Sequence, residues 1–507
     1  GGRVTENWFD LNASRYTASS ILQRMELLKT GYMGTLSLGW DNYLFLELTG
    51  RQERSSTLKD KSFFYPSANL SFLFSNAFRM PAWWNHGKLR LSYGIVGNAP
   101  ETYAANIIYE QGSDNGFTWN YVPSSWGNAN IRPEKKYEYE IGLESKFLNN
   151  RLGFDVSYYN NRVKDQILST PQPSSSGVKY VLMNVGEVAN EGWDISVSAT
   201  PVLTKNFRWD LTANYGIYHN KVVKLAEGVP YLEISNIGGG GAKIQAVEGR
   251  PMGDIYVQMP QMNENGDYLV SDKGLYLNQT DLQRVGNINP DGVGGLFSSF
   301  SYKNIFLDFS IDFRIGGDVI NEMYQYSTAS GLTPESLQYR DTEHGGLSYY
   351  YPGNNNASGT PVQVDPSSGA GPNGEIIYHD GIILPGVVAS TGEKNTRIIP
   401  AGYYYNQTYN WGTQSEQLTY RHSVFDNTYV KLRELTIGYQ FPEKLTAKLG
   451  MTRLSVSIFG RNLFYFYKAL KNYDAESSVG TSWASQAVVG GSTTATRNFG
   501  VSLRASF

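Results

Sequence analysis

The sequence predicts an all-β protein, an antiparallel transmembrane β-barrel with long extracellular loops and short periplasmic turns. Segments in which apolar and polar residues alternate with a period of two recur from one end of the 507 residues to the other, as half-buried strands require. Aromatic residues make up 14% of the chain and there are 53 glycines, yet the mean hydropathy is only −0.38. A barrel explains how a chain rich in aromatic residues can have a low mean hydropathy. Its apolar lipid-facing residues alternate with polar inward-facing ones, so their hydropathies cancel in any average along the chain. Short and long connections also alternate between the expected strands, which is typical of outer-membrane barrels.

The charge and the cysteine content exclude several other classes. The chain has 43 Lys+Arg and 46 Asp+Glu, a formal net charge of −3, and so lacks the basic excess of a nucleic-acid-binding protein. With no Cys there is no disulfide framework, thiolate metal site or Cys nucleophile. No apolar run reaches about 18 residues, which argues against a transmembrane helix.

The segment 305–315 shows the alternation most clearly. Its odd positions are all apolar, whereas its even positions include Asp308, Asp312 and Arg314. The C-terminal segment repeats the pattern. We expect thirteen strands and a weaker fourteenth within 8–20. The thirteen are at 32–40, 43–54, 64–75, 88–97, 135–147, 151–168, 180–202, 206–224, 293–302, 305–317, 428–441, 452–467 and 496–507.

The connections divide into two sets that we assign to opposite ends of the barrel. Several short ones contain Asn, which tolerates the positive φ of tight hairpins, and aromatic residues flank them as in an interfacial girdle. Cross-strand aromatic pairing in a soluble sheet is the alternative explanation. The long connections would be extracellular and largely without regular structure. They are 55–63, 98–134, 169–179, 225–292, 318–427 and 468–495.

An ordered set of short motifs is more specific than the pattern of strands. Glu248-Gly249-Arg250-Pro251-Met252-Gly253-Asp254 is followed by Val285-Gly286-Asn287-Ile288-Asn289-Pro290 and Phe313-Arg314-Ile315-Gly316-Gly317-Asp318. Later blocks are Tyr429-Val430-Lys431-Leu432-Arg433-Glu434-Leu435 and Gly460-Arg461-Asn462-Leu463-Phe464. In this order the blocks resemble the SusC/RagA family of TonB-dependent outer-membrane transporters, over nearly the whole chain.

The resemblance implies a barrel of about 22 strands around a plug domain, in the outer membrane of a Gram-negative cell. It also implies a SusD-like surface lipoprotein as a lid, coupling to the TonB complex, and an oligosaccharide or peptide as the imported ligand. We find neither a plug-like segment nor a TonB box. Residues 1–507 are therefore expected to be the C-terminal portion of the barrel, with the plug and the N-terminal strands elsewhere.

No catalytic residue, metal site or cofactor is expected. The chain lacks G-x-S-x-G, P-loop and H-E-x-x-H motifs. His379-Asp380 with His422 could serve a hydrolase at the barrel mouth, but solvated loop residues are the simpler interpretation. The segment 263–267 only loosely resembles a calcium loop, because it lacks the EF-hand spacing.

Two groups of side chains are candidates for contact with a ligand. The strand alternation places carboxylates on the face away from lipid, where they would line a hydrophilic path, a merely wet lumen, or a surface paired with a plug. The inward-facing candidates are Asp308, Asp312, Arg314, Glu138 and Glu140, and Asp312 is expected to pair with Arg314. Exposed aromatic rings in the loops could stack on sugars or peptides, pack within the loop, or contact the lid. These are Trp119, Tyr121, Trp126, Tyr403, Tyr404, Tyr405 and Trp411.

The sequence thus favours a subunit of a TonB-dependent nutrient importer, in which gated passage replaces covalent chemistry. A surface ligand-binding or adhesion protein on a barrel anchor, and a passive porin, are the alternatives. Glycan and peptide ligands are not distinguished.

Overall fold

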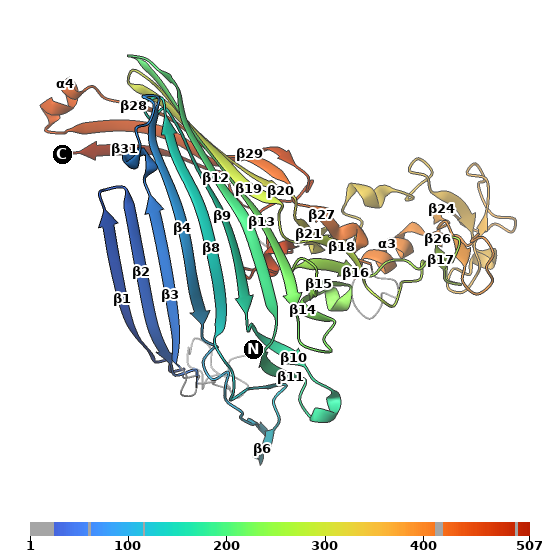
Figure 1. The fold of residues 1–507 in the computed structure, drawn as a ribbon. Helices are drawn as coiled ribbons and strands as arrows, with labels where there is room; N and C mark the ends of the chain where they lie inside the picture. The colour runs from blue at the N-terminus through green and yellow to red at the C-terminus, as the bar shows by residue number, and fades with distance from the viewer. Residues whose placement is uncertain (1–24, 59–61, 115–116, 411–418, 492–494) are drawn as a thin grey trace, which may run out of the picture.

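The computed structural model describes residues 25–58, 62–114, 117–410, 419–491 and 495–507, and the weaker strand expected within 8–20 lies outside them. Thirteen strands form one large sheet, in which every neighbouring pair is antiparallel. They form a curved wall (Figure 1). The all-β prediction is therefore confirmed. In sheet order the strands are β1 (Lys29–Trp40), β2 (Leu44–Ser55), β3 (Ser62–Phe72), β4 (Trp84–Asn98), β8 (Glu134–Phe147), β9 (Leu152–Lys164), β12 (Glu187–Leu203), β13 (Phe207–Lys224), β19 (Gly292–Tyr302), β20 (Ile305–Ile315), β28 (Tyr429–Gln440), β29 (Arg453–Lys468) and β31 (Asn498–Ser506).

All thirteen expected strands are present, and the largest difference concerns 180–202. This stretch divides into β11 (Tyr180–Asn184) and β12, because Gly186 adopts a positive φ of 101° between them. β11 leaves the wall and joins a small sheet with β10 (Ile167–Pro171) and β7 (Ser125–Trp126). The run from Tyr180 to Met183 is apolar on both faces and does not alternate, so the continuous strand expected over 180–202 was wrong at this point.

The shortest connections are tight hairpins, as their sequences predict. Asp41 and Asn42 lie at φ of 46° and 57°, and Leu148, Asn149 and Asn150 also lie in the left-handed region. Rings near these turns contact one another; Trp83 and Phe147, for example, stack with centroids 5.8 Å apart. Asn therefore provides the left-handed geometry that the hairpins need.

The register places polar residues of the whole wall on one face, because directly paired residues of neighbouring strands point the same way. One continuous row runs Asp155, Ser196, Asn214, Gly295, Asp312 and Lys431. The apolar partners, such as Phe309 and Ile311, occupy the opposite face, as alternation requires.

The long loops are not structureless, contrary to the expectation. They gather at one end of the wall in Figure 1, and the turn with α4 (Glu443–Thr446) lies at the other. The loop strands are β5 (Glu110–Asp114), β6 (Phe117–Tyr121), β14 (Tyr231–Ile237), β15 (Ala242–Val247), β16 (Asp254–Val257), β17 (Leu269–Val270), β18 (Gln283–Asn287), β21 (Asp318–Asn321), β22 (Leu347–Tyr350), β23 (Val362–Gln363), β24 (Ile377–Ile382), β25 (Val387–Val388), β26 (Ile399–Pro400), β27 (Val424–Asp426) and β30 (Val488–Val489). The remaining helices are α1 (Phe74–Ala77), α2 (Glu322–Ala329) and α3 (Ala401–Tyr409).

The loops supply most of the buried core. One cluster joins Ile244 and Ile255 of two loop strands to Ile320, Tyr420 and Val488 of later loops. These contacts link segments far apart in the sequence, which is why local patterns did not predict them. In the part of the chain that the structure describes, no helix is long and apolar enough to cross a membrane.

Candidate functional site on the polar face of the wall

A cavity of about 840 Å³ opens on the polar face, lined by residues of β9, β12, β13, β19, β20 and β28. Its lining includes Asp155, Asp194, Asn214 and Asp312. Gly295 lies between Asn214 and Asp312 in the register, and a Cβ there would approach Asn214 Oδ1 to 3.2 Å. The cavity can therefore offer hydrogen bonds to a polar ligand along several strands.

The inward-facing carboxylates expected from the sequence share this face. Glu138 and Glu140 lie on it in β8, and Asp308 and Asp312 lie on it in β20. Most have partners: Lys136 Nζ is 2.5 Å from Glu138 Oε2, and Ser299 Oγ donates to Asp308 Oδ1 at 2.6 Å. Pairing of this kind makes the face hydrophilic without leaving it uniformly anionic. Whether it borders a transport path stays a prediction.

Arg314 also lies on this face, but the expected ion pair with Asp312 is wrong. Asp312 Oδ2 pairs instead with Arg433 Nε at 2.5 Å. The Arg314 guanidinium donates to two backbone carbonyls, those of Gly316 at 3.2 Å and Ile288 at 3.0 Å. The strand ends at Ile315, and the turn at Gly316 and Gly317, with φ of 69° and 79°, brings the carbonyl of Gly316 back onto the side chain of Arg314.

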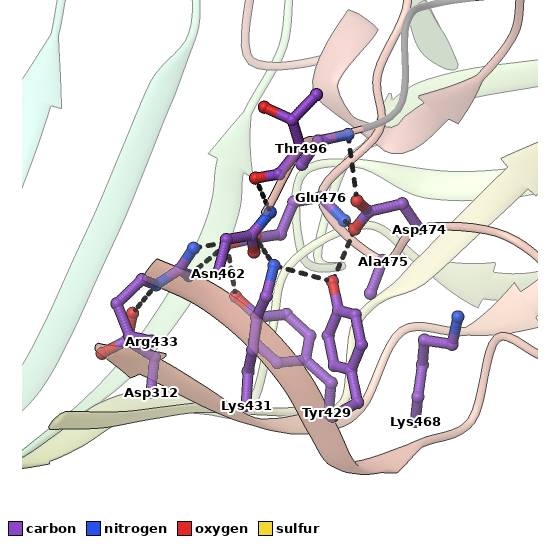
Figure 2. A network of polar contacts seen from close by, with 12 residues as sticks. Asp312, Tyr429, Lys431, Arg433, Asn462, Lys468, Asp474, Ala475, Glu476 and Thr496 are labelled. Carbon is purple, nitrogen blue, oxygen red and sulfur yellow. Dashed lines mark hydrogen bonds and ion pairs between the residues drawn. The ribbon is translucent and has the colours of Figure 1, made fainter. Parts of the chain in front are cut away.

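Arg433 is the centre of a polar network that joins the wall to the loop after β29 (Figure 2). Its guanidinium contacts Asp312 on β20 and both carboxylate oxygens of Glu476 in the loop. Lys431 Nζ is 2.6 Å from Glu476 Oε2, although Lys431 is only 1% exposed. Two cations and two carboxylates thus neutralise one another where the loop meets the wall.

A β-bulge makes this network possible. Ser310 pairs with Glu434 and Ile311 with Leu432, so Arg433 is an extra residue in β28. An extra residue interrupts strict alternation and redirects a side chain. Arg433 consequently reaches Asp312 on the polar face, next to Lys431. The unalternating run Lys431-Leu432-Arg433-Glu434 was the signal in the sequence, and our sequence analysis missed it.

The carboxylate of Glu476 is held in its charged form. Burial raises the pKa of Glu476, but hydrogen bonds from Arg433 and Lys431 outweigh it and lower the pKa to about 2. Asp474 accepts from the hydroxyl of Tyr465 at 2.5 Å and from the backbone N–H of Glu476 at 3.1 Å. Asn462 Nδ2 donates to the carbonyl of Thr496 at 3.0 Å. Both ends of the loop are therefore fixed to β29.

The candidate aromatic residues fall into two environments. Tyr403, Tyr404 and Tyr405 lie on α3, where Tyr405 is 4% exposed and donates its hydroxyl to the carbonyl of Glu335 at 2.8 Å. Trp119 and Tyr121, on β6, are 47% and 44% exposed. Trp126, on β7, packs edge-on against Tyr109. Trp411 lies outside the described residues.

The candidate histidines contact different residues. His379 Nδ1 is 2.8 Å from Ser348 Oγ, but Ser348 is only 2% exposed. His422 stacks on Tyr409, and burial lowers its pKa. The segment 263–267 is a turn in which Asn263 Oδ1 accepts from two backbone N–H groups. Among the described residues, no group of three His, Asp or Glu side chains could hold a metal ion.

The sequence of this chain matches a family of known membrane proteins. The model of the TonB-dependent receptor-like β-barrel matches residues 7–246. TonB-dependent receptor P3 of Formosa agariphila is 23% identical over 483 residues, which are 88% of this chain and 42% of that protein. TonB-dependent receptor P26 of the same organism is 30% identical over 330 residues, 58% of this chain and 32% of the relative. SusC of Bacteroides thetaiotaomicron is 29% identical over 247 residues, 44% of this chain and 24% of SusC.

Solved structures agree on the fold. The RagAB peptide transporter matches with a TM-score of 0.69 and 19% identity, covering 99% of this chain and 50% of that one. The open-open state of the RagAB peptide importer matches with a TM-score of 0.66 and 19% identity, covering 98% and 49%. This chain spans half or less of the length of each of these proteins. The family model, the curated relatives and the shared fold thus show that this chain is similar to TonB-dependent receptors of the outer membrane, SusC among them.

Proposed function

We propose that the protein containing this chain imports oligosaccharides or oligopeptides across the outer membrane, with energy supplied through TonB and with a SusD-like surface lipoprotein over its loops. The observation that carries this proposal is the polar cavity on the inner face of a wall whose opposite face is apolar. A wall of this kind offers hydrogen bonds to a polar solute while remaining stable in lipid.

The folded loops support an importer more than a passive pore. The loop after β29 is fixed to the wall through Glu476, and β30 in this loop pairs with β21 of another loop. Ordered loops of this kind can form a binding surface above the barrel, whereas a pore needs only an open entrance. The exposed rings of Trp119 and Tyr121 would then contact either ligand or lid.

The class of oligomer stays open at this level. RagAB is described as a peptide transporter, which favours peptides by analogy of fold alone. The cavity lining has carboxylate, amide and hydroxyl groups that suit both peptides and sugars.

Uptake by whole cells tests the proposal. Cells that express the protein should accumulate a fluorescent oligopeptide or oligosaccharide, and deletion of TonB should abolish the accumulation. Uptake that continues without TonB would indicate a porin. Surface binding without accumulation would indicate the second alternative, an adhesion protein on a barrel anchor.

A further inference from the structure

Arg314 and Tyr429 line two neighbouring cavities at once. One is the cavity of about 840 Å³ on the polar face. The other, of about 280 Å³, lies between the wall and the loop after β29, and its lining includes Asn427, Glu476 and Gln486. A ligand group that enters the smaller cavity therefore meets the side chain of Arg314 from the loop side.

Arg314 has hydrogen-bonding capacity that the protein does not use. A guanidinium carries five N–H donors, and within the described part of the chain only Nε and Nη2 have acceptors, both of them carbonyl oxygens. Among the described residues, no carboxylate forms an ion pair with Arg314. Asp318 accepts from the N–H of Asn287, and Asp426 accepts from Thr428. Arg90 and Arg433, on the same face, both pair with carboxylates.

Asn427 lines the smaller cavity and carries an unsatisfied acceptor. Its side chain is 4% exposed, and its Nδ2 donates to the carbonyl of Ala475 at 3.0 Å. Its Oδ1 is buried and has no hydrogen-bond partner. Buried polar atoms without partners are rare, because they lose their bonds to water and gain none. A ligand donor beside Asn427 Oδ1 would remove this deficit.

The other charges of the cavity do not oppose an anion. Glu476 is the carboxylate in its lining, but Lys431 and Arg433 both contact it and neutralise its charge. The guanidinium of an arginine binds carboxylates and phosphates through charge-assisted hydrogen bonds, and of these two groups the carboxylate is the one found in peptides and in uronic acids. In a peptide the C-terminal residue carries its own backbone N–H beside the carboxylate, and in a uronic acid the sugar ring that bears the carboxylate also carries hydroxyl groups, so each source also has a donor for Asn427.

We propose that Arg314 and Asn427 form a subsite for a carboxylate group of the imported oligomer, with Arg314 Nη1 donating to the carboxylate and Asn427 Oδ1 accepting from the neighbouring N–H or O–H group. This subsite rests on the proposed function and narrows it to ligands that carry a carboxylate. A neutral oligomer would leave the arginine without an acceptor.

Equilibrium binding to the detergent-solubilised protein tests the subsite separately from transport. The probes are pentaalanine with a free C-terminus against its C-terminal amide, and tetragalacturonate against its methyl ester. At least one acidic probe should bind about 10- to 100-fold more tightly than its neutral partner, as expected for a charge-assisted bond. Arg314→Gln should reduce this preference to about twofold or less. Arg208→Gln, which removes another guanidinium of the polar face, should preserve it.

Asn427→Asp provides a second variant in case Arg314→Gln does not fold. It keeps the shape of the side chain but adds a negative charge to the smaller cavity. It should therefore weaken binding of the acidic probe and leave binding of the neutral probe unchanged. The proposal is wrong if neither acidic probe is preferred by the wild type, if neither binds at millimolar concentration, or if both variants keep the preference. If uptake by cells does not require TonB and the purified protein still prefers the acidic probe, the proposed function is wrong but the subsite remains supported.

Discussion

Lys431 on the wall and Glu476 in the loop after β29 form an ion pair of 2.6 Å, and the side chain of Lys431 is almost completely buried. A buried ammonium group is stable only with a counter-charge. The pair therefore couples the position of an external loop to the barrel wall. Arg433 strengthens the coupling, because it contacts both Glu476 and Asp312.

Glu476→Gln should release the loop. The substitution leaves Lys431 buried without a negative partner, and should lower the free energy of loop opening by about 2–4 kcal/mol. Hydrogen exchange of residues 469–491 in the membrane-embedded protein measures this. Glu443→Gln, at an exposed site in α4, is the matched control and should leave the exchange unchanged. Equal exchange in the two variants would show that the ion pair does not hold the loop.

Acid should release the same loop in a defined range of pH. The pKa of Glu476 is lowered from 4.5 to about 2 in the folded protein, so protonation favours the released state. The stabilisation is complete above pH 4.5, declines below it, and is lost as the pH falls through about 2. Because Glu476 is partly exposed, solvent screening keeps its contribution below the value of about 3 kcal/mol that a shift of this size would give in a fully buried site.

Fluorescence of Trp483 reports this change, because its Nε1 donates to Asn289 Oδ1 at 3.2 Å from within the loop. The contribution of Trp483 is the tryptophan emission of the wild type minus that of Trp483→Phe. This contribution should change between pH 4.5 and pH 2. In Glu476→Gln this titration should be absent, and its persistence there would assign it to another group.

The sequence was informative where structure depends on local patterns. Alternation located β20 and β31, and Asn149 and Asn150 marked a hairpin by their tolerance of positive φ. It failed where a contact joins distant segments. No residue near Glu476 in the sequence indicates that it pairs with Arg433, 43 residues earlier. In the sequence, the bulge that orients Arg433 is visible only as an interruption of the alternation in β28.

The same reason explains the loops and the aromatic candidates. Tyr405 reads as an exposed loop aromatic, yet it packs with Tyr409 and Ala401 in a core completed by residues of α2. Gln325 of α2 bonds to the carbonyl of Thr419, 94 residues away. Such long-range packing decides which rings remain accessible, and Trp119 is among those that do.

Phe309→Arg and Ser310→Arg should have very different effects. Phe309 lies on the apolar face, whereas Ser310 lines the polar cavity. An arginine facing hydrocarbon near the midplane costs about 2–4 kcal/mol, and one facing water costs much less. Urea titration of folding into phospholipid vesicles measures both. Equal losses would mean that the apolar face of β20 does not face lipid.

Proteolysis of intact cells should cut the long loops and spare the short turns. The stretch 353–357 is exposed within the largest loop, and the turn at 442–451 is also largely exposed in the isolated chain. Only the first should be cleaved from outside, because the outer membrane protects the periplasmic end. Permeabilised cells provide the control, in which both should be cleaved. The reverse pattern in intact cells would invert the orientation.

The last prediction concerns the two edges of the sheet. β1 and β31 are its end strands, and they are not paired with each other. Unpaired strand edges are not tolerated in lipid, where each bare backbone group costs several kcal/mol. We therefore propose that strands beyond these thirteen complete the barrel, and that residues 1–507 are its C-terminal portion.

Disulfide formation can test this seam cleanly, because the chain has no cysteine of its own. Thr35→Cys with Thr49→Cys joins directly paired residues of β1 and β2, and should crosslink in the outer membrane. Ser37→Cys with Ser502→Cys, one on each edge strand, should not, because other strands separate the two edges. Efficient linkage of Cys introduced at 37 and 502 would mean that the thirteen strands close on themselves, and the proposed additional strands would then be unnecessary.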